Sequence, residues 1–224
     1  MQYFSLILRE LIIYTDPHFE GNGDDLRLAI TGHWKNRKAF HGHHEDGKPI
    51  YWLPPVRYLG GIQPRIVAIK SGISDLDNIY QGLEEVLRLG KEEFRITATE
   101  MSDKTVAFGL SESLYTYISI SPWVALNQKR FEEYICSGNK SKRKNLLENI
   151  FIGNLLSLSK GLGYHVESRI LAKLHSFIDE PIKFKEVPLT TFKIKITTNF
   201  ILPEAIGIGR HTSLGYGRFN ELKA

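Results

Sequence analysis

The chain has 224 residues, 42% of them hydrophobic, and a formal net charge of +4, so it can bury the core of one large or two small domains. Cys136 is its single cysteine, which excludes an intramolecular disulfide framework and a cysteine-based zinc site. The sequence shows neither a cationic leader nor an apolar run near the ~20 residues that span a bilayer, which predicts a cytoplasmic protein without a membrane partner.

The charge divides unevenly between the two halves of the chain. Residues 1–112 carry 13 Lys and Arg against 16 Asp and Glu, a net charge of −3. Residues 113–224 carry 16 against 9, a net charge of +7. A basic half suits a polyanionic partner, although moderate charge also serves solubility alone.

Apolar periodicity in the first half predicts four strands and two helices. Asp24 or Asp25 can cap the first helix, and Ser74 with Asp77 can cap the second, which we expect to end at Gly90. The order β-α-β-β-α-β is that of a ferredoxin-like domain. The predicted strands lie at residues 3–14, 50–58, 65–70 and 93–100.

The second half repeats this order more loosely, after a junction predicted at Gly109–Ser113. Helices are predicted at Asn127–Cys136 and Lys144–Leu158. We therefore predict an α+β protein of two tandem ferredoxin-like (βαββαβ) domains, which cover residues 1–110 and 111–224. The predicted strands of the second half lie at residues 114–121, 164–172 and 187–199 and at the C-terminus.

A glycine-rich segment, Ala205–Phe219, has Gly-x-Gly pairs around a cationic, hydroxyl-rich centre. Glycine lets a partner approach the backbone closely, and N–H groups beside arginine and hydroxyl side chains suit a phosphate. The spacing matches neither a P-loop nor a dinucleotide fingerprint, and a hairpin between two closing strands is the alternative. The candidate phosphate-binding residues are Gly207, Gly209, Arg210, His211, Ser213, Gly215, Gly217 and Arg218.

The segment Phe40–Gly47 holds three of the eight histidines, His41, His43 and His44, between glycines that predict a loop. Histidine can give or take a proton at physiological pH, so two imidazoles with a nearby lysine and tyrosine suffice for acid–base chemistry. A zinc site and an exposed loop without a function are the alternatives. The nearby polar residues are Lys35, Lys38 and Tyr51.

Two further groups of cations lie in the basic half. One stands at a predicted helix start, where cations oppose the helix dipole and an anionic ligand would relieve the cost. The other is Lys193 and Lys195, which a period of two places on one face of a strand, where they could follow a phosphate backbone. A solvated surface is the alternative for both groups. The first group is Lys140, Lys142, Arg143 and Lys144.

Three segments, which together span nearly the whole chain, resemble one family. Gly207–Gly217 resembles the C-terminal glycine loop of RAMP-superfamily CRISPR proteins. His41–Tyr58 is similar to part of the CRISPR precursor-RNA-processing endoribonucleases, the sixth Cas family, in which His-x-His precedes a Tyr-x-Tyr-Pro strand. Asn149–Gly163 is similar to a central segment of that family. The chain departs from the pattern with Tyr-Trp-Leu-Pro at 51–54 and with Arg57 in place of a glutamine.

This resemblance implies metal-independent cleavage of CRISPR repeat RNA by two ferredoxin-like domains, without a cofactor. The ribose 2′-OH attacks the adjacent phosphate and leaves a 2′,3′-cyclic phosphate and a 5′-OH, so the protein supplies positioning and proton transfer. We expect His43 and His41 to form the acid–base pair and Tyr51 to orient or stabilise the reacting groups. Lys35 or Lys38 would neutralise charge on the phosphorane.

CRISPR repeat RNA is thus the expected partner, with effector-complex subunits and a second copy of this chain as further candidates. The cations and glycines identified above are the expected RNA-binding residues. Two other functions stay open: a RAMP subunit that holds guide RNA without cutting it, and a metal-dependent hydrolase. The ligands of such a metal would be His41, His43, Glu45 and Asp46.

Overall fold

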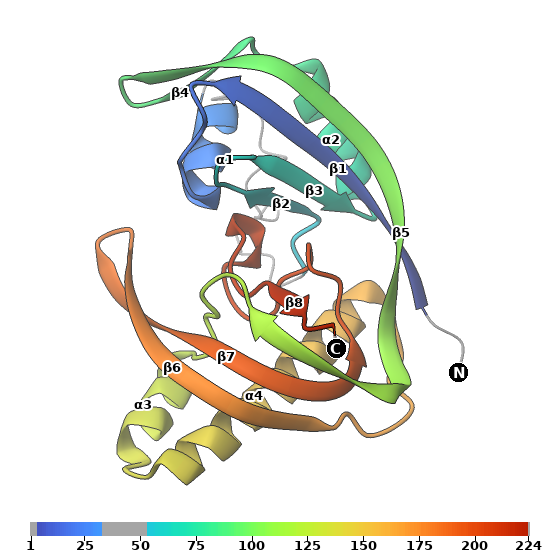
Figure 1. The fold of residues 1–224 in the computed structure, drawn as a ribbon, viewed down its shortest axis with the longest axis vertical. Coiled ribbons are helices and arrows are strands. Elements are labelled where there is room, and N and C mark those ends of the chain that lie inside the picture. Colours follow the sequence, from blue (N-terminus) through green and yellow to red (C-terminus); the bar gives the residue numbers. More distant parts are fainter. Residues whose placement is uncertain (1–3, 33–52, 224) are drawn as a thin grey trace, which may run out of the picture. The chain divides into compact units, whose positions relative to one another are not determined.

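The structure, a computed structural model, describes residues 4–32 and 53–223 (Figure 1). The chain divides into two compact units. The N-terminal unit consists of Leu6–Val106 and Ser213–Gly215. The C-terminal unit consists mainly of Ala107–Thr212, together with the residues before Leu6 and after Gly215. None of the helices in the described ranges combines the length and apolar character that a membrane span requires.

The N-terminal unit contains an antiparallel sheet and two helices. Its elements are β1 (Phe4–Asp16), α1 (Gly23–Thr31), β2 (Val56–Leu59), β3 (Arg65–Ile69), α2 (Gly72–Gln81), β4 (Val86–Leu89) and the first part of β5 (Glu92–Ser119). The strand order is β2-β3-β1-β5, and β4 pairs with β5 as an additional hairpin strand. With β5 as the fourth strand, this is the predicted ferredoxin-like order.

Three helix boundaries of this unit differ from the predictions. The cap of α1 is Asn22, whose side chain accepts hydrogen bonds from the N–H groups of Asp24 and Asp25, while the Asp25 carboxylate accepts one from the N–H of Asn22. Asp25 therefore completes a capping box in the first turn of the helix, and neither aspartate is the N-cap residue. The helix α2 begins at Gly72 and ends at Gln81 instead of continuing to Gly90, because Val86–Leu89 pairs with β5.

The C-terminal unit contains a second antiparallel sheet, with α3 and α4 against one face of its long hairpin (Figure 1). Its elements are the end of β5, α3 (Gln128–Cys136), α4 (Lys140–Leu162), β6 (Ala172–Phe184), β7 (Val187–Ile201) and β8 (Phe219–Glu221). The strand β5 pairs with β7 and with β8, and β7 pairs with β6. This α+β architecture of antiparallel sheets confirms the predicted fold class.

Two predictions for this unit need correction. The strand predicted at 164–172 begins only at Ala172, and α4 is longer than predicted because Asn139 caps it, its side chain accepting from the N–H of Ser141 at 2.8 Å. The junction predicted at Gly109–Ser113 lies inside β5, where the pairing with β7 shifts register between Leu110 and Tyr115. The division into residues 1–110 and 111–224 stays a prediction.

Each unit has its own core. In the N-terminal unit, residues of the sheet such as Leu11 and Ile66 are fully buried in one cluster with residues of both helices. In the C-terminal unit, the ring of Trp123 packs edge-on against Phe151 and Phe219. Such edge-to-face pairs add about 0.5–1.5 kcal/mol to the burial of their area.

One polar residue of β2 is buried without a partner. Arg57 is 0% exposed, and within the described part of the chain none of its three guanidinium nitrogens forms a hydrogen bond. Its cross-strand neighbour is the apolar Val67. Burial lowers the pKa of Arg57 to about 10, because a low-dielectric environment disfavours the charged form.

Replacing Arg57 with methionine should therefore stabilise the free protein by about 1–4 kcal/mol at neutral pH, since it removes an uncompensated buried charge and retains an apolar chain. Chemical denaturation measures this change. The matched control is Arg95→Met, which alters an exposed arginine of β5 and should change stability by less than about 0.5 kcal/mol. Destabilisation by Arg57→Met would mean that the guanidinium has a stabilising partner.

Candidate functional site

The expected catalytic segment joins α1 to β2. Its described flanks are Gly32, whose N–H donates to the carbonyl of Leu28 at 2.8 Å, and Leu53. Both flanks belong to the N-terminal unit. The five expected catalytic residues lie outside the described residues, as does His44. They are Lys35, Lys38, His41, His43 and Tyr51.

The glycine loop, residues 205–219, is held by its own backbone. The N–H of Ile208 donates to the carbonyl of Gly217 at 2.9 Å, and the N–H of Gly217 donates to Pro122 at 2.9 Å. The N–H of Arg210 donates to Val124 at 3.0 Å. These three N–H groups are thus committed to carbonyl acceptors and are not available for a phosphate.

Two glycines of the loop permit a close approach between its two sides. A Cβ on Gly207 would lie 2.2 Å from the carbonyl oxygen of Tyr216, and one on Gly217 would lie 2.0 Å from that of Ile208. Gly217 also has a φ of +68°, a backbone conformation that residues other than glycine rarely adopt. Packing of the loop therefore accounts for glycine at both positions.

The tip of the glycine loop, Ser213–Gly215, belongs to the N-terminal unit. It packs where α1 begins and β2 ends. A Cβ on Gly23 would lie 2.3 Å from the carbonyl oxygen of Leu214 and 2.3 Å from that of Tyr58. The loop therefore contributes to the same unit that carries both flanks of the expected catalytic segment.

The cationic side chains of the loop differ in their surroundings. Arg218 forms an ion pair with Glu204, with 2.6 Å between Nη1 and Oε1, and is largely buried. Arg210 is exposed and has one long hydrogen bond of 3.4 Å to the carbonyl of Leu126. The imidazole of His211 packs against the ring of Phe184, with 4.3 Å between ring centroids. Arg210 is thus the more accessible of the two guanidinium groups.

The cations at the start of α4 lie near aromatic rings. The guanidinium of Arg143 lies 4.7 Å from the ring centroid of Tyr134, and Nζ of Lys140 lies 5.9 Å from that of Phe177. These distances are typical of cation–π contacts. Lys142 is exposed, and Lys144 is half-buried.

Lys193 and Lys195 lie on the exposed side of β7, as their alternation predicted. Phe192 is fully buried, and its ring centroid lies 5.2 Å from that of Tyr134 on α3. Lys193 forms an ion pair of 2.7 Å with Glu180. Lys195 is exposed and, among the described residues, forms no ion pair.

The structure does not bring the two cation groups onto one surface. Phe177, under Lys140, pairs with Ile194 of β7, and Ile194 is on the buried side of that strand. Because side chains alternate along a strand, Lys193 and Lys195 face the opposite side of the sheet. Within residues 4–32 and 53–223, no group of three or more His, Cys, Asp or Glu side chains could hold a metal ion.

Solved structures identify the class of this fold. A crystal structure of Cas6b matches with a TM-score of 0.87 and 27% identity over 98% of this chain and 100% of that one. The crystal structure of a CRISPR RNA processing endoribonuclease, Cas6b, matches with a TM-score of 0.73 and 27% identity over 96% of this chain and 100% of that one. The type IV crRNA endonuclease Csf5, 12% identical with a TM-score of 0.65, shares the fold alone. The fold is that of the Cas6 proteins.

Family models define the chain further. The Cas6b N-terminal domain matches residues 7–107, and the Cas6b C-terminal domain matches residues 109–222. The chain therefore belongs to the Cas6b family, which confirms the resemblance found in the sequence. The protein MJ0978 of Methanocaldococcus jannaschii is 38% identical over 131 residues, which are 58% of this chain and 88% of that protein.

Proposed function

We propose that this protein is an endoribonuclease that cleaves CRISPR precursor transcripts within the repeat and so produces guide RNAs. The observation that carries this proposal is membership of the Cas6b family, together with similarity along almost the whole chain to a CRISPR RNA processing endoribonuclease. The net charge of +7 on residues 113–224 fits an RNA partner.

In the proposed mechanism, RNA supplies its own nucleophile. One histidine of the pair His41 and His43 takes the proton of the ribose 2′-OH as it attacks the adjacent phosphate, and the other gives a proton to the departing 5′-oxygen. Tyr51 orients the reacting groups, and Lys35 or Lys38 stabilises the charge that develops on the phosphorane. The reaction needs no metal ion and leaves a 2′,3′-cyclic phosphate and a 5′-OH.

Among the expected RNA-binding residues, Lys142, Lys195 and Arg210 are the strongest candidates for phosphate contacts. All three are exposed. Lys193 and Arg218 already pair with carboxylates, so a phosphate would have to compete for their charge. We propose that the glycines shape the loop, whereas Arg210 binds the RNA backbone.

Incubation of the protein with repeat RNA in excess EDTA tests this function. We expect cleavage at one position, with a 2′,3′-cyclic phosphate and a 5′-OH on the products. A matched RNA with a single 2′-deoxynucleotide at the cleavage position should bind equally well and remain intact, since it lacks the nucleophile. Products with a 3′-OH and a 5′-phosphate would contradict the mechanism, and tight binding without cleavage under any condition would indicate a non-catalytic RNA-binding subunit.

A further inference from the structure

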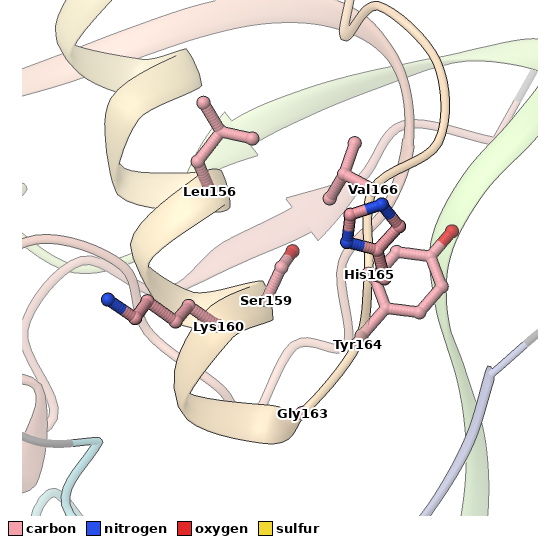
Figure 2. Close-up of a pocket in the computed structure, with 7 residues that line it drawn as sticks. All are labelled: Leu156, Ser159, Lys160, Gly163, Tyr164, His165 and Val166. Carbon is pink, nitrogen blue, oxygen red and sulfur yellow. The ribbon is translucent and has the colours of Figure 1, made fainter.

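A pocket of about 430 Å³ opens in the C-terminal unit where α4 ends (Figure 2). The helix stops at Gly163, whose φ of +73° reverses the chain. The next residues therefore lie beside the last turns of the helix. Leu156, Ser159 and Lys160 line one side of the pocket, and Tyr164, His165 and Val166 line the other. The volume is within the range of small-ligand pockets.

The pocket contains a buried polar group without a partner. Ser159 is 1% exposed, and within the described residues its Oγ forms no hydrogen bond. Figure 2 shows this hydroxyl between the helix and the segment that carries His165 and Val166. Because a buried hydroxyl without a partner is unfavourable, a ligand with a donor or acceptor at this position would restore the missing hydrogen bond.

The facing wall is partly aromatic and is anchored at Tyr164. The phenol oxygen of Tyr164 accepts a hydrogen bond from the N–H of Leu110 at 3.0 Å. Its ring packs edge-on against Phe108 and Phe200, with centroid distances of 5.8 and 6.3 Å. The adjacent His165 is exposed at the rim. A planar imidazole thus stands beside an open pocket whose apolar lining includes Leu156 and Val166.

We propose that this pocket receives one unstacked nucleobase of the bound RNA, an inference that rests on the proposed function. His165 offers a face for stacking, and Leu156 and Val166 cover the apolar surface of the base. The Ser159 hydroxyl can donate to or accept from the edge of the base. A free phosphate fits less well, because the apolar walls would desolvate its charge, whereas Lys160 is exposed and can meet the backbone phosphate beside the base.

Two substitutions test the pocket. His165→Ala should weaken binding of repeat RNA by about 5- to 100-fold, the range for loss of one base-stacking contact. Ser159→Ala should weaken it by about 3- to 10-fold, the range for one hydrogen bond, without lowering the melting temperature of the free protein. The control is His18→Ala, which removes an exposed histidine of the N-terminal unit and should leave binding unchanged.

Repeat RNAs with one abasic nucleotide at a time identify the base. An abasic nucleotide at one position should strongly weaken binding of the RNA to the wild-type protein. With that RNA alone, His165→Ala should cause no further loss of affinity. If the wild-type protein binds and cleaves the RNA but both pocket variants match His18→Ala, the pocket inference is wrong and the proposed function stands. If the wild-type protein does not bind repeat RNA, the proposed function and this inference both fail.

Discussion

Replacing His43 with alanine should slow cleavage of repeat RNA by about 10²- to 10⁴-fold and leave RNA binding intact, because positioned general acid–base catalysis contributes a factor of that size. His41→Ala should slow the same step, since one histidine accepts the proton of the 2′-OH and the other protonates the leaving oxygen. Single-turnover rates with saturating protein measure the chemical step, and filter binding measures affinity.

His44→Ala is the matched control for this experiment, because it removes an imidazole from the same segment. Its cleavage rate should stay close to that of the wild-type protein. If both His41→Ala and His43→Ala cleave at the wild-type rate, these histidines are not the catalytic pair. A large loss of cleavage rate in His44→Ala alone would assign the catalytic role of His43 to His44 instead.

Gly217→Ala should destabilise the protein by about 3–5 kcal/mol, the combined effect of steric overlap and backbone strain. The new Cβ would lie 2.0 Å from the carbonyl oxygen of Ile208. Those two residues are already joined by a backbone hydrogen bond of 2.9 Å, so neither side of the loop can move away without losing it. Thermal or chemical denaturation of the variant measures the change.

Gly61→Ala separates the steric contribution from the backbone strain. Gly61 also has a positive φ, +108°, but a Cβ there would meet nothing within 4 Å. We expect a loss of only about 1–3 kcal/mol, which is the strain alone. If Gly217→Ala is as stable as Gly61→Ala yet no longer binds RNA, then glycine is needed at position 217 to let RNA approach the backbone and not for packing of the loop.

Local sequence patterns predicted the elements whose periodicity is unambiguous. The strands at 3–14 and 65–70 and the helix at Asn127–Cys136 were predicted nearly to their ends, because apolar spacing and a capping asparagine act locally. The segment Leu83–Leu89 fits a helical stripe as well as a strand. Its pairing with β5 decides between them, and that partner is fixed by tertiary structure rather than by local sequence.

The same limit applies to the candidate site. The sequence supplied the histidines, the cations and the glycines, but their chemistry alone does not show that Arg218 pairs with Glu204 or that Lys140 and Lys195 lie on opposite faces of a sheet. The pocket at the end of α4 was missed. The helical spacing of Leu156, Ser159 and Lys160 predicts that they share one side of the helix. The sequence does not show that the segment after Gly163 turns back to face them.

The position of the glycine-loop tip has a consequence for how the protein is made. A ribosome delivers Leu6–Val106 roughly a hundred residues before Ser213–Gly215, which complete the same unit, although domains generally fold in the order of their synthesis. Until Leu214 has been synthesised, the backbone around Gly23 and Tyr58 in the nascent N-terminal half lacks this packing partner. Completion of the unit that carries the proposed catalytic segment is thereby tied to synthesis of the proposed RNA-binding half, and a chain that terminates early lacks Ser213–Gly215.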